Sequence, residues 1–199
     1  FPTERFTRRS DLERGALSVG TPGNFAGWAE LVRTYGRMPL GDALQPAISL
    51  ARDGFALAAF GVREFNEQIP IIKGLPELYA AWSRNYTGGT ETVRLGHIVC
   101  QPELARTLEA LAKNGAAHLY DGPLGQLIVE HLAGLGGYLT MTDLANVAPE
   151  WKDPLSVGYR GLTVCTLPPP CEGFQFLLTL RILDGFDVAA SLPDATLPV

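Results

Sequence analysis

The residues best suited to chemistry lie in the stretch TLPPPCEGFQFL, residues 166–177, where three prolines precede a cysteine, an acid and a glycine. The apolar run that follows predicts a helix, so Cys171 would sit where free backbone N–H groups and the helix dipole favour a thiolate. A catalytic cysteine also needs a base, and the chain offers only His97, His118 and His131, none of them in a recognisable motif. The stretch is therefore either a nucleophile loop or a stiff turn that aims a helix, and the residues favour the turn.

Other arrangements that support nucleophilic or phosphate chemistry are incomplete. No Gly-x-Ser-x-Gly elbow occurs in the sequence. The glycine-rich segment 20–23 precedes a predicted helix, but it lacks the Gly-Lys-Ser/Thr of a P-loop and loses one N–H donor at Pro22. A sharp turn that seats the helix is the favoured interpretation. Acid pairs such as Glu64 with Glu67 have the spacing of a solvated helix face rather than of a general acid/base dyad.

The cysteines give no evidence of a metal site. Cys100, Cys165 and Cys171 are too few and too irregularly spaced for a disulfide framework, and no CxxC or His/Cys pairing indicates zinc. One pair with one cysteine left over stays an open alternative in an oxidising compartment. No cluster implies a metal or cofactor, so we expect neither, and the residues alone contain no complete catalytic constellation.

Composition places the chain among globular proteins. Its 199 residues are 46% hydrophobic and 19% charged, with a net charge of -5, so we expect no nucleic-acid partner. The arginines near the start, Arg5, Arg8, Arg9 and Arg14, are a local exception and are interpreted as a solvated arm. No apolar run approaches the roughly 20 residues that cross a bilayer, so we expect no membrane contact from this segment. The N-terminus has no signal peptide, but Phe1 need not begin the gene product, so localisation stays open.

Apolar periodicity and Gly/Pro punctuation predict the elements that must position these side chains. Six or seven helices and one hairpin are expected, and the last stretch, 189–199, is expected to be a loop in which the sequence carries little information. The alternating residues around Arg160-Gly161 predict the hairpin, and Thr140 with Asp143 predicts a capping box. A lone hairpin is marginal, so we expect it to belong to a larger sheet. The predicted helices include 24–35, one around 44–51, 102–114, 123–135, a short one ending near 145, and one from about 174 that ends at Gly185.

Four stretches of the chain form a recognisable pattern when they are taken together and in order. They are GALSVGTPGNFAGWAELVRTYGRMPLGDALQPAISLARDGF (15–55), LARTLEALAKNGAAHLYDG (104–122), GGYLTMTDLANV (136–147) and PLSVGYRGLTVCTLPPPCEGFQFLLTLRILDGFD (154–187). In this order they resemble the large subunit of γ-glutamyltranspeptidases and γ-glutamyltranspeptidase-like acylases. The similarity covers nearly the whole chain, apart from about 56–96 and the last ten residues.

The resemblance implies a fold and an activity. Members are N-terminal-nucleophile hydrolases with an αββα sandwich, so the fold class expected is α+β, with this chain as a mainly helical portion whose hairpin joins a larger sheet. Residues 1–199 would be a partial large subunit, helical over about 20–148 and with the hairpin and following helix at about 154–187. The precursor cleaves itself, and the threonine exposed at the start of the small subunit attacks the γ-glutamyl amide. Its α-amine serves as the base, which accounts for the missing histidine partner.

The partners follow from the same resemblance. We expect the small, catalytic subunit from the same precursor and a γ-glutamyl substrate such as glutathione, with no catalytic residue in this chain. A typical transpeptidase would be periplasmic or extracellular, and a form without a signal peptide cytoplasmic. Two alternatives are kept: a related acylase acting on other acyl amides, of the cephalosporin acylase type, and a non-catalytic helical binding module.

The chain departs from the family pattern at one place. Members commonly continue Pro-Pro-Pro with Ser, then Ser or Gln, then Gly, whereas this chain has Cys171 and Glu172. The loop borders the active-site region in the family, so Pro170, Cys171, Glu172 and Gly173 are expected at the edge of the substrate pocket. The negative charge of Glu172 would disfavour an anionic glutamyl donor.

Overall fold

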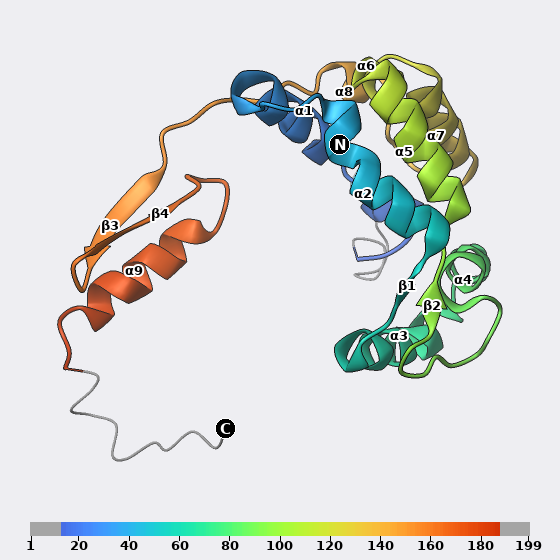
Figure 1. Ribbon diagram of the computed structural model, residues 1–199, viewed down its shortest axis with the longest axis horizontal. Helices are drawn as coiled ribbons and strands as arrows, with labels where there is room; N and C mark the ends of the chain where they lie inside the picture. Colours follow the sequence, from blue (N-terminus) through green and yellow to red (C-terminus); the bar gives the residue numbers. More distant parts are fainter. Residues whose placement is uncertain (1–12, 188–199) are drawn as a thin grey trace. The chain divides into compact units, whose positions relative to one another are not determined.

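The computed structural model describes residues 13–187, and the chain divides into two compact units, Phe1–Pro149 and Glu150–Val199. The first, unit 1, is built almost wholly of helices (Figure 1). Five of its helices match predicted ranges: α1 (Asn24–Tyr35), α2 (Leu40–Asp53), α5 (Pro102–Asn114), α7 (Pro123–Gly134) and α8 (Met141–Ala145). A 3₁₀ turn at Ala16–Ser18 precedes them, and the short helix α6 (Ala117–Tyr120), which was not predicted, lies between α5 and α7.

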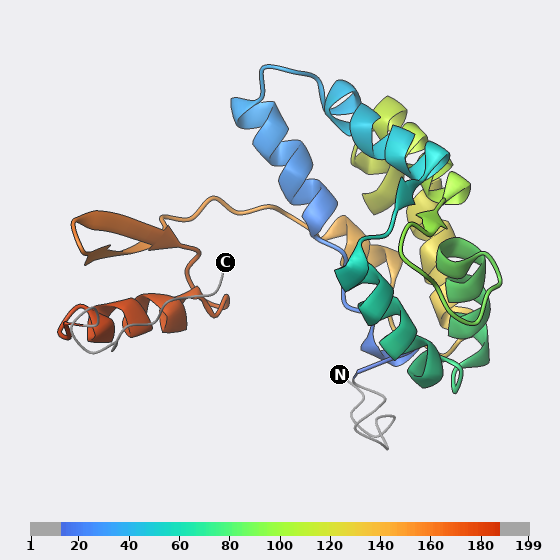
Figure 2. The ribbon, with the colours of Figure 1, turned by 60° about the horizontal axis from the view of Figure 1, so that its bottom comes forward.

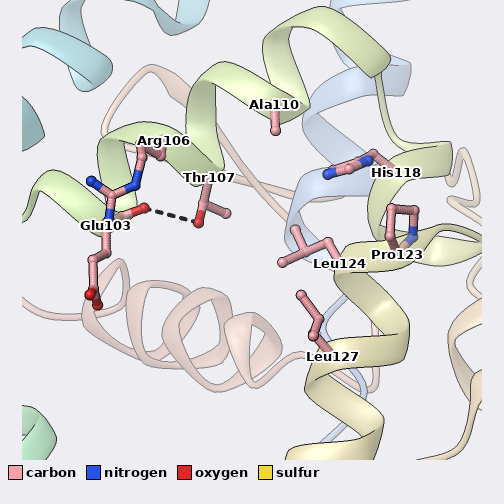
Figure 3. Close-up of a pocket in the computed structure, with 8 residues that line it drawn as sticks. All are labelled: Glu103, Arg106, Thr107, Ala110, His118, Pro123, Leu124 and Leu127. Atoms are coloured by element: carbon pink, nitrogen blue, oxygen red, sulfur yellow. Dashed lines mark hydrogen bonds between the residues drawn. The ribbon is translucent and has the colours of Figure 1, made fainter.

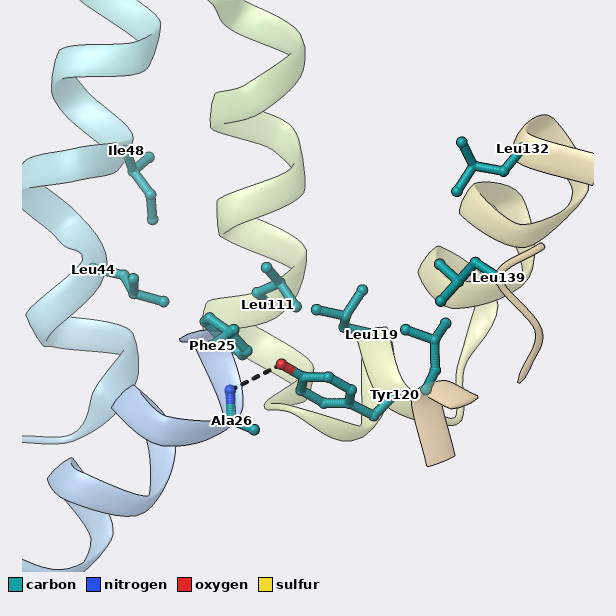
Figure 4. Packing of buried hydrophobic residues seen from close by; sticks show 10 residues of the cluster. Phe25, Ala26, Leu44, Ile48, Leu111, Leu119, Tyr120, Leu132 and Leu139 are labelled. Atoms are coloured by element: carbon teal, nitrogen blue, oxygen red, sulfur yellow. Dashed lines mark hydrogen bonds between the residues drawn. The ribbon is translucent and has the colours of Figure 1, made fainter. Parts of the chain in front are cut away.

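The main core of unit 1 forms where α1, α2, α5, α6, α7 and α8 bring their apolar side chains together (Figure 4). Ile48 on α2 and Leu144 on α8 are almost completely buried. The predicted stripe of Leu44, Ile48 and Ala51 faces inward as the helical period requires. The buried residues of this cluster are Phe25, Ala26, Leu44, Ile48, Leu111, Leu119, Tyr120, Leu132, Leu139 and Leu144.

Helices α2 and α5 pack closely because a glycine faces a backbone carbonyl. A Cβ at Gly41 would lie 3.1 Å from the carbonyl oxygen of Ala112, so only a small residue allows this approach. An ion pair between Arg52 and Glu109 also joins the two helices. This pair joins residues 57 apart in the sequence, so no local pattern indicates it.

The N-termini of two helices are capped by side chains. The buried Tyr120 hydroxyl accepts a hydrogen bond from the Ala26 amide at 3.0 Å and donates to the Pro22 carbonyl at 2.9 Å. The glycine-rich segment 20–23 is therefore held as the turn into α1, and an amide that an anion would need is already used. At α8, Thr140 and Asp143 form the predicted capping box.

Residues 55–99 form an excursion that the sequence did not predict. It leaves after α2 and returns before α5 (Figure 2), and its two ends pair as β1 (Phe55–Ala56) and β2 (Ile98–Val99). Between them lie α3 (Ala59–Ile72), α4 (Pro76–Trp82) and a π-helical turn, Ser83–Thr87.

The excursion has a small core of its own around Leu57, Val93 and Val99. The Asn66 side chain fixes the returning loop because it donates to the Val93 carbonyl at 3.0 Å and accepts from the Val93 amide at 2.9 Å. Two-residue strands and a side-chain clamp leave no periodic pattern, so the sequence could not indicate them.

The second unit, unit 2, contains the predicted hairpin and helix. Strands β3 (Leu155–Tyr159) and β4 (Leu162–Thr166) pair in antiparallel register, and α9 (Gly173–Leu183) follows. The turn needs two left-handed residues, which are Arg160 with φ 48° and Gly161 with φ 80°. The helix was expected to end at Gly185; it ends at Leu183, with Asp184 as its C-cap. None of the helices among the described residues has the length and apolar content that crossing a membrane requires.

Candidate functional site

The candidate pocket-edge residues lie in the turn between β4 and α9, residues 167–172, which we call the β4–α9 turn. The Pro169–Pro170 peptide bond is cis, and the Cys171 amide donates to the Pro168 carbonyl at 3.3 Å. Glu172 is the N-cap residue of α9, but its side chain accepts no capping hydrogen bond. Cys171 and Glu172 are both exposed, so the turn presents a thiol and a carboxylate at the start of the helix.

Gly173 sets how closely α9 approaches β4. A Cβ at this position would overlap the side chain of Thr166, the last residue of β4. At the other end of α9, the Asp184 carboxylate accepts a hydrogen bond of 3.4 Å from the Arg160 amide in the hairpin turn. Both ends of α9 are thus fixed to the hairpin, and the first contact determines where Cys171 and Glu172 lie.

Cys171 lies in the turn that leads into α9, where both the turn and the nucleophile interpretation place it. All three histidines belong to unit 1, so unit 2 itself supplies no histidine base for the thiol. His97 contacts the Tyr86 carbonyl at 3.0 Å, and His131 is exposed near the end of α7. Cys100, Cys165 and Cys171 are all exposed and free.

His118 lies in a cavity of about 410 Å³ between α5 and α7 (Figure 3). Its walls are mainly the apolar side chains of Ala110, Leu124 and Leu127, and the Thr107 hydroxyl donates to the Glu103 carbonyl at 3.1 Å. A larger cavity of about 1400 Å³ lies among segment 13–19, α4 and the end of α7. Neither of these two cavities is lined by a residue of the β4–α9 turn.

The resolved pKa shifts belong to structural pairs at the surface. Hydrogen bonds from the Thr140 hydroxyl and then the Thr140 amide lower the pKa of Asp143, as a capping box requires. The Lys152 ammonium, 2.9 Å from Glu150, lowers the pKa of that carboxyl by hydrogen bonding and charge. Among residues 13–187, no three His, Cys, Asp or Glu side chains gather as a metal site would require.

Comparison with known proteins gives the family. The family model described as gamma-glutamyltranspeptidase matches residues 2–196. This chain belongs to the γ-glutamyltranspeptidase family. The resemblance read from the sequence is confirmed, and the match also spans 56–96, which carried no resemblance by itself.

Curated members of the γ-glutamyltranspeptidase family match along nearly the whole chain. The chain is 38% identical over 180 residues to the mouse "Glutathione hydrolase 5 proenzyme", a match that covers 90% of this chain and 31% of that protein. It is 31% identical over 188 residues to the "Acylase ACY 1 proenzyme" of Pseudomonas sp. (strain V22), covering 94% of this chain and 33% of the relative. The chain therefore spans about a third of the length of the curated relatives it matches.

Solved structures of the γ-glutamyltranspeptidase type agree with the fold. The γ-glutamyltranspeptidase of Helicobacter pylori matches with a TM-score of 0.82 at 27% identity, over 95% of this chain and 54% of that one. The cephalosporin acylase of Bacillus halodurans matches with a TM-score of 0.79 at 32% identity, over 86% of this chain and 32% of that one. The fold prediction, a mainly helical α+β portion of such an enzyme, is confirmed.

Proposed function

We propose that this chain is the large-subunit portion of an enzyme that hydrolyses γ-glutamyl amides such as glutathione or transfers their glutamyl group. The observation that carries the proposal is the family match over residues 2–196. Relatives named glutathione hydrolase proenzyme, at 38% and 37% identity, support it. The chain itself would supply the scaffold, and the reacting groups would come from the small subunit of the same precursor.

The proposed division of labour agrees with the chemistry of the described residues. Unit 2 contains no histidine that could act as a base for the exposed thiol of Cys171, and the three histidines of unit 1 lie in no recognisable catalytic motif. In the family mechanism, the hydroxyl of an N-terminal threonine attacks the γ-glutamyl carbonyl carbon while its own α-amine takes the proton. The C–N bond then breaks, the amine leaves with that proton, and water or an acceptor amine releases the glutamyl group. In such a mechanism Cys171 is neither the nucleophile nor the base.

The test is an assay of the protein produced from the complete gene. With γ-glutamyl-p-nitroanilide we expect release of p-nitroaniline, and with glutaryl-p-nitroanilide much less. A preference for the glutaryl substrate would favour the acylase alternative. Hydrolysis of neither substrate by a protein that has cleaved itself would contradict both.

Glu172 bears on the choice between a γ-glutamyl and a glutaryl donor. We propose that residues 170–173 border the substrate pocket, as the family resemblance implies. In that position the exposed carboxylate of Glu172 would repel the terminal carboxylate that both donors carry, but it would attract the α-ammonium that only the γ-glutamyl donor carries. The charge of Glu172 would therefore disfavour the glutaryl donor more.

Replacing Glu172 with glutamine is expected to lower the ratio of kcat/KM for γ-glutamyl-p-nitroanilide to that for glutaryl-p-nitroanilide, because the attraction for the α-ammonium is lost. Because a solvated pair of charges interacts by no more than about 1 kcal/mol, the expected fall is about two- to fivefold. The matched control is Glu77→Gln, which removes an exposed carboxylate from α4 in unit 1. An unchanged ratio in Glu172→Gln would remove this role for Glu172.

A further inference from the structure

The excursion, residues 55–99, packs its apolar side chains apart from the main core of unit 1. Among the described residues, the main cluster is drawn from segments 16–48 and 108–147, which lie on either side of the excursion in the sequence. The cluster of the excursion lies wholly inside 55–99. Its members are Leu57, Val62, Phe65, Tyr86, Val93 and Val99. A segment with a core of its own can change position relative to its neighbour without opening that core.

Aromatic and polar contacts inside the excursion tie its parts into one body. The rings of Phe65, Trp82 and Tyr86 contact one another with centroids 4.6, 5.1 and 5.6 Å apart. The His97 ring nitrogen contacts the Tyr86 carbonyl at 3.0 Å, and the Asn66 clamp holds the returning loop to α3. Helix α3, the π-helical turn and the loop before β2 would therefore move together.

The chain enters and leaves the excursion at one narrow neck. Gly54 follows α2 with φ 85°, and Gln101 precedes α5. Next to them the two-residue strands β1 and β2 pair beyond the ends of α2 and α5 (Figure 1). The Gln101 amide donates to the Ala51 carbonyl at 2.8 Å, which fixes the near side of the neck to α2. Neighbouring crossings at the ends of elements suit a hinge, because a few backbone dihedrals there can absorb a rotation.

The cavity of about 1400 Å³ is a cleft between the excursion and the rest of unit 1. One wall is α4, and the other is segment 13–19 with the end of α7. Leu78 on the first wall and Leu135 on the second are 40% and 41% exposed, so an approach of the walls would bury apolar surface. Each wall carries both acidic and basic side chains, so like charges do not oppose that approach. The charged side chains of the lining are Glu13, Arg14, Glu77, Arg84 and Glu130.

We propose that the excursion is a hinged lid, which turns as one body about the neck at Gly54 and Gln101 and so opens and closes this cleft. The rotation would leave both apolar clusters intact. It would strain the ion pair between Arg84 and Glu103, but a pair 3.9 Å apart on exposed side chains contributes little to stability. The motion lies within unit 1 and does not depend on the proposed function.

The first test measures distances by pulsed electron paramagnetic resonance in the protein produced from the complete gene, with its exposed cysteines replaced by serine. Spin labels at Glu77→Cys on α4 and His131→Cys on α7 span the cleft, and both positions are exposed. The matched control is Glu67→Cys with Glu77→Cys, because both of these exposed residues belong to the excursion.

We expect the distribution of distances across the cleft to be about twice as wide as the distribution within the excursion, or wider. Equal widths would overturn the proposal, whether the neck itself or another part of the precursor holds the excursion in place. Both distances are read without substrate, so the result is independent of any activity.

The second test alters the neck. Gly54→Ala puts a side chain on a residue with φ 85°, and its Cβ would lie 2.6 Å from a methyl group of Ile98. Since this clash pushes β2 away from β1, we expect the distribution across the cleft to widen by about 1.5-fold, and the distribution within the excursion to stay unchanged.

The control for the neck variant is Gly74→Ala, in the turn between α3 and α4. A Cβ there meets no listed atom closer than 3.5 Å, so neither distribution is expected to change. Equal distributions across the cleft in the two variants would contradict a hinge at Gly54. The first test uses the native neck, so it decides the proposal even where Gly54→Ala does not fold.

Discussion

Replacing Leu144 with alanine is expected to lower the free energy of unfolding of unit 1 by about 2–5 kcal/mol. Leu144 is 0% exposed and is the apolar anchor of the short helix α8, which packs on α6 and α7. A Cβ at Gly125 of α7 would lie 3.0 Å from a methyl group of Leu144, so the side chain fills its site tightly. Truncation removes its transfer free energy and leaves a cavity that these short, capped elements cannot close.

The matched control is Leu127→Ala on α7, because this leucine is 65% exposed and its truncation leaves no buried cavity. We expect a change of about 0.5 kcal/mol or less for it. Urea denaturation followed by far-ultraviolet circular dichroism measures both. Equal midpoints for the two variants would show that α8 contributes little to the core around Tyr120 and Leu139.

The helices of unit 1 were predictable where a period, a starting proline and a terminal glycine agreed. Helix α5 begins at Pro102 and ends before Gly115 as expected, since each local preference points to the same boundaries. The structure of the excursion 55–99 was not predictable, because it depends on contacts between residues that are distant in the sequence. Pro70 stands inside α3 and the Asn66 clamp joins residues 27 apart in sequence, and neither leaves a local pattern.

The candidate site was predictable only in part. The sequence indicated a stiff turn that aims a helix, and the structure shows that this turn brings Gly173 against Thr166. That residues 170–173 border a substrate pocket stays a prediction, because they line neither of the two cavities described. The proposed threonine nucleophile would be exposed only by chain cleavage, so no spacing of residues within this sequence could indicate it.

The close contact between Gly173 and Thr166 predicts that a substitution at Gly173 destabilises unit 2. Gly173→Ala is expected to destabilise the packing of α9 on the hairpin by about 1–3 kcal/mol, because the new Cβ overlaps a β-branched side chain that cannot turn away freely. Alanine would gain at most about 1 kcal/mol over glycine in helix propensity, so the steric term exceeds it. Hydrogen exchange of the β3 and β4 amides measures the change.

A double-mutant cycle separates this contact from a general effect of replacing a glycine. Thr166→Ala removes the hydroxyl and methyl groups that the Cβ would strike, so the double variant should be less destabilised than the sum of the single ones by about 1 kcal/mol or more. Gly158→Ala in β3 is the control, since a Cβ there meets no atom within 4 Å. Additive effects would mean that α9 and β4 can move apart at little cost. Glu172 would then not be held in one place, and a role for its charge in choosing the donor would lose its structural basis.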